Sequence, residues 1–209
     1  MPVASSNADP RIDELLSYWL GAPYPTDADA LARQSLWFTK SAATDAEIGT
    51  RFGPLVEQAL AGTLDGWAQT PRGRLALIVL LDQFTRNLFR GTAKSFAGDA
   101  HALQLALDGI LEGHDVDPGV PDVARIFFYL PLEHAEDGPL QEQSVALFKK
   151  LHELALPQTR SFLAGTLDYA HRHQEVIKRF GRFPHRNPIL GRESTPAELE
   201  YLAQPGSGF

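Results

Sequence analysis

The strongest constraint on the fold is the regular spacing of helix start and stop signals along the chain. A capping residue precedes a proline at Asp9-Pro10 and again at Thr70-Pro71, the pairing typical of the N-cap and the first helical position. Gly21 follows apolar residues at helical spacing, where a helix is expected to end. No stretch alternates apolar and polar residues over the length of a strand. The sequence therefore predicts an all-α protein.

These signals, together with apolar residues three and four positions apart, predict about eight or nine helices of average length. A capping box at Thr44 is expected to open the second helix, and Gly53-Pro54 to break or kink it. Asp99 is expected to cap the fourth helix, and Pro131 to interrupt the fifth. We expect a single-domain array of antiparallel helices over residues 10–21, 45–60, 71–91, 99–113, 121–130, 139–151, 157–180 and a short segment after residue 195.

The run Leu75–Leu81 fits a second interpretation, a buried parallel strand, because a short apolar run does not reveal its own period. Its surroundings favour a helix. The run follows a helix cap and continues into Asp82, Arg86 and Arg90, which are four residues apart, and no second strand exists for it to pair with. We therefore expect a long helix that is apolar on all sides before Asp82, and hence central in the fold.

The composition fits one compact domain. Of the 209 residues, 44% are apolar and 22% are charged, which is enough apolar material for a sizeable core. We expect the domain to span residues 9–203, with flexible termini at 1–8 and 204–209, where the sequence is small, polar or rich in glycine and proline. The chain has no cysteine, which excludes disulfides, cysteine-bound zinc and a thiol nucleophile.

Charge and hydropathy argue against two classes of partner. The longest apolar run has seven residues, far fewer than the roughly 20 that cross a bilayer. The first residues lack the basic and apolar regions of a signal peptide. We therefore expect a soluble, cytoplasmic protein without a membrane partner. A formal net charge of −7 disfavours contact with phosphate backbones, so nucleic acid is not expected as a partner.

The first of three unusual segments covers residues 80–91 and reads Leu-Leu-Asp-Gln-Phe-Thr-Arg-Asn-Leu-Phe-Arg-Gly. Asp82, Arg86 and Arg90 share one helical stripe, and Gln83 and Asn87 lie on the neighbouring one. One interpretation is an exposed ion pair at i, i+4, which stabilises a helix by about 0.2–0.5 kcal/mol. The other is the polar wall of a pocket, which the apolar turns before Asp82 favour.

The second segment, residues 128–137, places Glu133, His134 and Asp137 after Pro131. The four-residue spacing of the two carboxylates predicts that they converge with the imidazole within one turn, a group suited to general acid–base catalysis. A structural histidine bonded to a carboxylate is the competing interpretation. Because the spacing matches no zinc motif, we predict no metal site.

The third segment, residues 179–192, crowds Arg182, His185, Arg186 and Asn187 between apolar side chains. A solvated basic loop needs no such side chains, so we interpret these cations as held in place to meet an anion. His185 is expected to gain charge as the pH falls through about 6.5. His173 lies on the preceding predicted helix; taken alone, it is interpreted as a packing or surface residue.

In these segments the chain resembles a bacterial family catalogued as domain of unknown function 924. Its members share the pattern of residues 80–91, a Tyr-x-Pro-x-x-His-x-Glu-Asp stretch and an Arg-Phe-Gly-Arg-Phe-Pro-His-Arg-Asn stretch. The resemblance extends from Trp19 to Thr195 and implies a helical fold similar to tetratricopeptide-type arrays, but no activity. Ala135 and Gly138 depart from the serine and the aliphatic residue of the pattern. The matching positions are Asp82, Gln83, Arg86, Asn87, Arg90, Glu133, His134, Glu136, Asp137, His173, Arg182, His185, Arg186 and Asn187.

The leading hypothesis is a small-molecule-binding protein, with or without catalysis, whose pocket brings the three segments together. Glu133, His134 and Asp137 would transfer protons in any reaction. The rival hypotheses are an interaction module that grips an acidic peptide, and motifs that only pin helices together. The sequence identifies no cofactor. An anionic ligand would be held by Asp82, Arg86, Asn87, Arg90, His173, Arg182, His185, Arg186 and Asn187.

Overall fold

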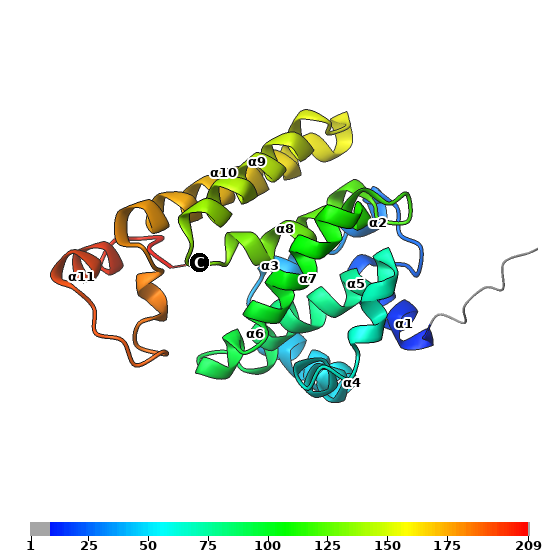
Figure 1. Cartoon of the computed structure of the whole chain (residues 1–209), viewed down its shortest axis with the longest axis horizontal. Coiled ribbons are helices and arrows are strands. Elements are labelled where there is room, and N and C mark those ends of the chain that lie inside the picture. Colours follow the sequence, from blue (N-terminus) through cyan, green and yellow to red (C-terminus); the bar gives the residue numbers. More distant parts are fainter. Residues whose placement is uncertain (1–8, 209) are drawn as a thin grey trace, which may run out of the picture.

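The computed structural model describes residues 9–208, and all regular structure in that range is helical (Figure 1). The predicted all-α fold is confirmed there. Residues 1–8 and 209, which belong to the termini expected to be flexible, lie outside the described residues. The described part of the C-terminal tail forms a turn after the last helix, in which the Ser207 hydroxyl donates to the carbonyl oxygen of Leu202.

The described chain contains eleven α-helices and six shorter helical segments. The α-helices are α1 (Pro10–Leu20), α2 (Asp27–Leu31), α3 (Gln34–Phe38), α4 (Ala42–Leu60), α5 (Pro71–Ile78), α6 (Thr85–Leu88), α7 (Asp99–Glu112), α8 (Ile126–Glu133), α9 (Gly138–Glu153), α10 (Pro157–Phe180) and α11 (Pro196–Leu202). The shorter segments are η1 (Asp65–Gln69), η2 (Val79–Phe84), η3 (Ala93–Phe96), η4 (His114–Val116), η5 (Asp122–Arg125) and η6 (Pro184–Arg186).

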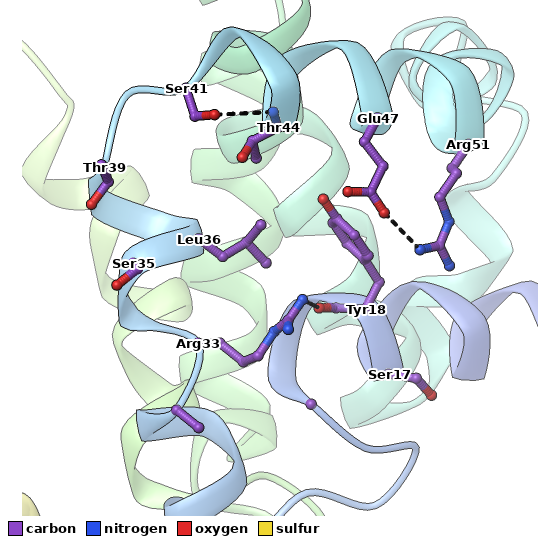
Figure 2. A pocket seen from close by; sticks show the side chains of 12 residues that line it. Ser17, Tyr18, Arg33, Ser35, Leu36, Thr39, Ser41, Thr44, Glu47 and Arg51 are labelled. Atoms are coloured by element: carbon purple, nitrogen blue, oxygen red, sulfur yellow. Dashed lines mark hydrogen bonds and ion pairs between the residues drawn. The ribbon is translucent and has the colours of Figure 1, made fainter.

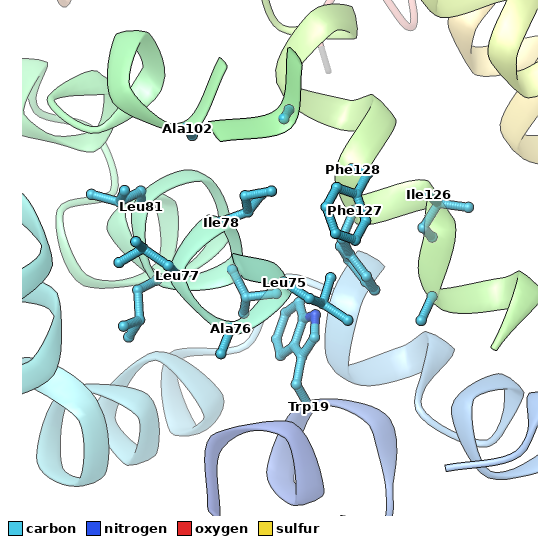
Figure 3. Packing of buried hydrophobic residues seen from close by; sticks show 14 of the residues in the cluster. Trp19, Leu75, Ala76, Leu77, Ile78, Leu81, Ala102, Ile126, Phe127 and Phe128 are labelled. Atoms are coloured by element: carbon cyan, nitrogen blue, oxygen red, sulfur yellow. The ribbon is translucent and has the colours of Figure 1, made fainter. Parts of the chain in front are cut away.

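At the centre of the fold lies one continuous helical run, made of α5, η2 and α6. Every residue from Leu75 to Leu81 is at most 1% exposed, because α1, α4, α7 and α8 pack around the run. Figure 3 shows its apolar side chains between Trp19 below and Phe127 and Phe128 beside them. The predictions of a helix and of its central position are therefore confirmed. Within the run, η2 is a π-helical turn, a feature that often marks functional sites.

α9 and α10 form an antiparallel hairpin that packs on α8 and extends away from the central run (Figure 1). This pairing of helices is the unit of tetratricopeptide-type arrays. Beyond the end of α10, a smaller hydrophobic cluster around Val176, Ile177 and Phe183 holds the last segment of the chain. None of the described helices combines the length and the apolar surface needed to span a bilayer.

Some expected boundaries are wrong for local reasons. The cap of α4 is Ser41, whose hydroxyl accepts from the Thr44 amide, so the helix begins earlier than the Thr44 box suggests. Pro54 and Pro131 lie inside α4 and α8 without ending them. Both helices bury apolar side chains in the core, and that packing outweighs one lost backbone hydrogen bond. Helices α2 and α3, which have five residues each, are not among the expected helices.

Candidate functional site

The first two predicted segments meet at Asp82, which lies in η2 and is 0% exposed. Oδ1 of Asp82 lies 2.7 Å from Nδ1 of His134 at the end of α8. The same oxygen lies 3.2 Å from Nη1 of Arg86, and Oδ2 accepts a hydrogen bond of 2.6 Å from Gln83. The histidine is therefore bonded to a carboxylate of the central run, which is 52 positions away in the sequence.

The protonation of this pair follows from burial and charge. Burial opposes the ionisation of Asp82, but the charges of Arg86 and His134 hold the pKa of Asp82 well below its ordinary value. Burial, followed by the charge of Arg86, lowers the pKa of His134. Near neutral pH the pair is thus a carboxylate and a neutral imidazole. Because a carboxylate only accepts, Nδ1 carries the proton and Nε2 is left as a hydrogen-bond acceptor.

The third segment joins through Asp99 at the start of α7. Both oxygens of Asp99 accept from Arg86, at 2.8 and 3.1 Å, and Nη1 of Arg186 lies 3.8 Å from Asp99. The prediction that Asp99 caps α7 is wrong, because Gly98 takes that position. A Cβ on Gly98 would lie 2.2 Å from the carbonyl oxygen of Leu81, so only glycine lets α7 begin this close to η2. We call these residues the Asp82 cluster: Asp82, Arg86, Asp99, His134 and Arg186.

Arg186 is the least satisfied member of the Asp82 cluster. Its guanidinium lies over the rings of Phe96 and Phe183, at 4.8 and 4.6 Å from their centroids. Its Nε is buried and has no hydrogen-bond partner among the described residues. Burial, followed by the charge of Arg86, lowers the pKa of Arg186 to about 10, so the side chain stays charged at neutral pH. A buried N–H donor of this kind is suited to a water or a ligand oxygen.

A second carboxylate–imidazole pair lies beside the first. Nδ1 of His173, in α10, is 3.0 Å from Oε1 of Glu133 and 2.9 Å from the carbonyl oxygen of Tyr169. The rings of His173 and His134 are 6.3 Å apart. Oε2 of Glu133 is buried without a hydrogen-bond partner in residues 9–208. Glu133 therefore keeps the capacity to accept a proton or a hydrogen bond.

His185 is close to the cluster, but its charge differs from what the sequence suggests. Its ring packs 5.8 Å from that of Phe183. Burial, followed by the charge of Arg186, lowers the pKa of His185 to about 4. The expectation that it gains charge near pH 6.5 is therefore wrong. A pKa of about 6.5 is that of a solvated imidazole, and His185 is largely buried.

Two further candidates bind the start of α4 rather than the Asp82 cluster. Arg90 donates to both oxygens of Asp45, from Nε at 2.9 Å and from Nη2 at 2.8 Å. Asn87 donates to the same carboxylate at 2.8 Å. Hydrogen bonds from Arg90 lower the pKa of Asp45. These contacts tie the end of the central run to α4.

The remaining predicted cations fix the chain after α10. Arg182 donates to both oxygens of Glu198, at 2.7 and 2.9 Å, and its hydrogen bonds help lower the pKa of Glu198 to about 2. Asn187 donates to Glu198 at 3.3 Å. Arg192 binds both oxygens of Glu136, at 2.6 and 2.9 Å. We call this set the C-terminal clasp: Glu136, Arg182, Asn187, Arg192 and Glu198.

Asp137 lies apart from both groups. It is exposed, and its carboxylate accepts from the Leu140 amide at 2.9 Å as the N-cap of α9. The expected convergence of Asp137 with Glu133 within one turn does not occur. Helix α8 ends at Glu133, so the four-residue spacing no longer places the two side chains on one helical face.

A cavity of about 770 Å³ opens beside the central run, between α3 and α10. We call it the α3–α10 cavity. Four predicted site residues line it, namely Arg86, Asn87, Arg90 and Glu133; Asp82, His134, Arg186 and the other candidates do not. Within residues 9–208, no group of three histidine, aspartate or glutamate side chains could hold a metal ion. The other lining residues include Gln83 and Lys40 and the aromatic side chains Trp37, Phe38, Phe148, Phe162 and Tyr169.

Sequence reasoning missed most of the apolar wall of this cavity. Trp37 and Phe38 come from the short helix α3, and Phe162 and Tyr169 come from α10. Neither stretch carries a polar motif. One signal was present in the sequence, the adjacent aromatic residues Trp37 and Phe38. Phe38 is 56% exposed, so it is not a core residue. Exposed aromatic side chains of this kind often mark binding surfaces.

Comparison with known proteins places the chain in a family. No curated protein matches it. A solved structure of a protein of unknown function from Agrobacterium tumefaciens is similar, with 38% sequence identity and a TM-score of 0.78, over 93% of this chain and 97% of that one. A family model described as "Bacterial protein of unknown function (DUF924)" matches residues 15–206. The family model and the similar solved structure agree. The chain therefore belongs to the DUF924 family of bacterial proteins.

Proposed function

We propose that the protein binds a small carboxylate with an apolar or aromatic body in the α3–α10 cavity. The observation that carries the proposal is the division of the cavity wall into two parts. Lys40, Arg86 and Arg90 supply positive charge, and Glu133 is the one acidic side chain that lines the cavity in the described range. The aromatic side chains come mainly from α3 and α10. The volume of about 770 Å³ is in the usual range for small-molecule sites.

Carboxylates orient the arginines of this wall but do not accept from all of their N–H donors. Asp45 accepts from Nε and Nη2 of Arg90, and no described residue accepts from its Nη1 group. Since a guanidinium carries five N–H donors, an arginine held in this way still offers hydrogen bonds to a ligand carboxylate. Lys40 is exposed and takes part in no ion pair within residues 9–208, so its charge is not offset locally.

The aromatic wall would hold the body of the ligand. Trp37 and Phe162 have ring centroids 6.3 Å apart, and so have Phe38 and Phe162. Flat apolar groups stack well on such rings. Of the three residues predicted to transfer protons, only Glu133 lines the cavity, so any acid–base chemistry on the ligand would pass through it.

The test uses octanoate and 3-phenylpropionate as probes, with their neutral amides as matched controls. We expect each carboxylate to bind and to change the fluorescence of Trp37, and each amide to bind about tenfold more weakly, because it lacks the charge-assisted hydrogen bonds. Arg90→Met should weaken binding of the carboxylates by about tenfold. Arg179→Met, which removes an exposed arginine over Phe180, should have no effect.

Equal binding of carboxylates and amides would contradict the role of the cations. Absence of binding by all four probes, with an acidic peptide binding instead, would favour the rival interaction module. Isothermal titration calorimetry measures both outcomes directly.

A further inference from the structure

A second cavity, of about 800 Å³, lies on the other side of α3, between α1 and the first half of α4. We call it the α1–α4 cavity. Figure 2 shows its wall, with Tyr18 projecting from α1 between Arg33 on one side and Glu47 and Arg51 on the other. Unlike the α3–α10 cavity, it has a single aromatic side chain in its wall and is lined mainly by hydroxyl and charged groups.

Tyr18 presents a buried phenol to this cavity. Its ring packs 5.2 Å from Phe52 and 6.4 Å from Phe84, so the residue is only 7% exposed. The hydroxyl is buried, and the Glu47 carboxylate is a weak acceptor for its hydrogen. Burial, followed by the charge of Glu47, raises the pKa of Tyr18, so the hydroxyl keeps its proton. The phenol oxygen can still accept a hydrogen bond from a hydroxyl of a ligand.

Arg33 supplies a positive charge that no carboxylate offsets. Its Nη2 donates to the backbone carbonyl of Tyr18 at 2.7 Å, and its guanidinium lies 5.6 Å from the Tyr18 ring centroid. Its Nε is buried and unbonded within residues 9–208. Arg51, by contrast, is 3.2 Å from Glu47 and 3.6 Å from Glu14. The cavity thus holds one neutralised arginine and one that retains its charge and a free donor.

The hydroxyl groups around these two side chains define the rest of the ligand. Ser35 projects from α3, Thr39 from the residue that follows it, and Thr44 from the first turn of α4 (Figure 2). Each hydroxyl both donates and accepts. A wall of this kind is matched by a ligand that carries hydroxyls of its own, and the weakly apolar lining gives little to a hydrocarbon body.

We propose that the α1–α4 cavity is a second binding site, specific for a small oxyanion that carries hydroxyl groups. Arg33 binds the carboxylate or phosphate oxygens through its free N–H donors, the Tyr18 hydroxyl accepts from a hydroxyl of the ligand, and the serine and threonine hydroxyls bind the remaining hydroxyls. The site is separate from the one proposed above. α3 stands between them, and Thr39 borders both cavities.

The experiment is a ¹H–¹⁵N NMR titration of the full chain, which reports binding residue by residue. The probes are glycerate and glycerol 3-phosphate, which separate carboxylate from phosphate, with glycerol and acetate as controls that lack the charge or the hydroxyls. We expect one or both hydroxylated anions to shift the amides of Ser35, Thr44 and Glu47, which line the α1–α4 cavity alone, and to leave those of Gly165 and Thr166 in the other cavity unchanged. Acetate and glycerol should bind at least about tenfold more weakly.

Two substitutions test the named groups. Arg33→Met keeps the aliphatic stem and should weaken binding by at least about tenfold, and Tyr18→Phe, which keeps the core packing, by about threefold. Arg179→Met is the matched control and should bind like the wild type. The proposal is overturned if neither hydroxylated anion shifts the three amides, if acetate binds equally well, or if Tyr18→Phe and Arg33→Met both bind unchanged. Shifts confined to Gly165 and Thr166 would support the α3–α10 cavity and reject this one.

Discussion

The Asp82 cluster and the C-terminal clasp use the same side-chain chemistry in two different ways. In the clasp, each arginine binds both oxygens of one carboxylate, Arg182 with Glu198 and Arg192 with Glu136. In the cluster, Asp99 is shared by two arginines, and the Nε of Arg186 is left without a partner among the described residues. The clasp is therefore saturated, whereas the cluster retains hydrogen-bonding capacity.

The comparison teaches that arginine density alone does not indicate a ligand site. Arg182 and Asn187 belong to a motif as rich in charge as the one around Arg86, yet neither lines a described cavity, and Arg86 does. What separates the two regions is unused hydrogen-bonding capacity next to a cavity. Four predictions test this distinction.

The largest effect should come from Asp82→Ala in the buried cluster. Asp82 is 0% exposed and offsets the charge of Arg86. Removing one partner of a buried pair leaves an uncompensated charge, so we expect the free energy of unfolding to fall by about 3–5 kcal/mol. Urea denaturation followed by circular dichroism measures it. A loss below about 1 kcal/mol, the range of surface pairs, would show that the cluster is no more tightly coupled than the surface.

Glu198→Gln should have a smaller effect in the clasp. The substitution keeps the shape of a side chain that is 2% exposed but weakens two charge-assisted hydrogen bonds from Arg182. We expect a loss of about 1–3 kcal/mol in the free energy of unfolding, measured by thermal denaturation. Binding of octanoate should stay unchanged. A change in octanoate affinity would mean that the clasp takes part in the site after all.

The pH dependence of stability probes His185 at the border of the two regions. Its pKa is about 4 in the folded state and about 6.5 in the unfolded state. Between these values the unfolded chain binds more protons, so stability falls as the pH drops from about 6.5 to about 4 and levels off below. We expect a contribution of about 1–2 kcal/mol, since His185 is partly exposed. In His185→Gln, denaturation curves across this range should lose that part of the slope; an unchanged slope would exclude His185 as its source.

Arg90→Met should have the smallest effect on stability. The pair with Asp45 is exposed, with 41% of the Arg90 side chain accessible, and such pairs contribute up to about 1 kcal/mol. The more informative result is the combination of two measurements. We expect a small loss in the free energy of unfolding and the roughly tenfold loss of carboxylate affinity described above. If stability falls as far as in Asp82→Ala, Arg90 belongs with the structural contacts instead.

The sequence predicted elements whose signals are local. The Asp9 and Thr70 caps and the Gly21 stop lie where expected, because each depends only on neighbouring backbone groups. The meeting of Asp82 with His134 was also predicted, from the rule that buried charges need partners. The pairing of Asp99 with Arg86 was not predicted. It depends on the close contact of Gly98 with the backbone of Leu81, which only the tertiary structure defines. The aromatic wall of the α3–α10 cavity was missed for the same reason.

The π-helical turn η2 absorbs one extra residue without changing the rotational phase of the helix that follows it. A π turn holds one residue more than an α turn, and each residue of a helix advances it by about 100°. Deleting one residue of Val79–Phe84 would let this turn close as an ordinary α turn, so Arg86, Asn87 and Arg90 would keep nearly the same orientation relative to α5. A relative with a one-residue gap at this point would therefore keep the same core and present the same cations to the cavity, and the difference would be confined to the turn itself.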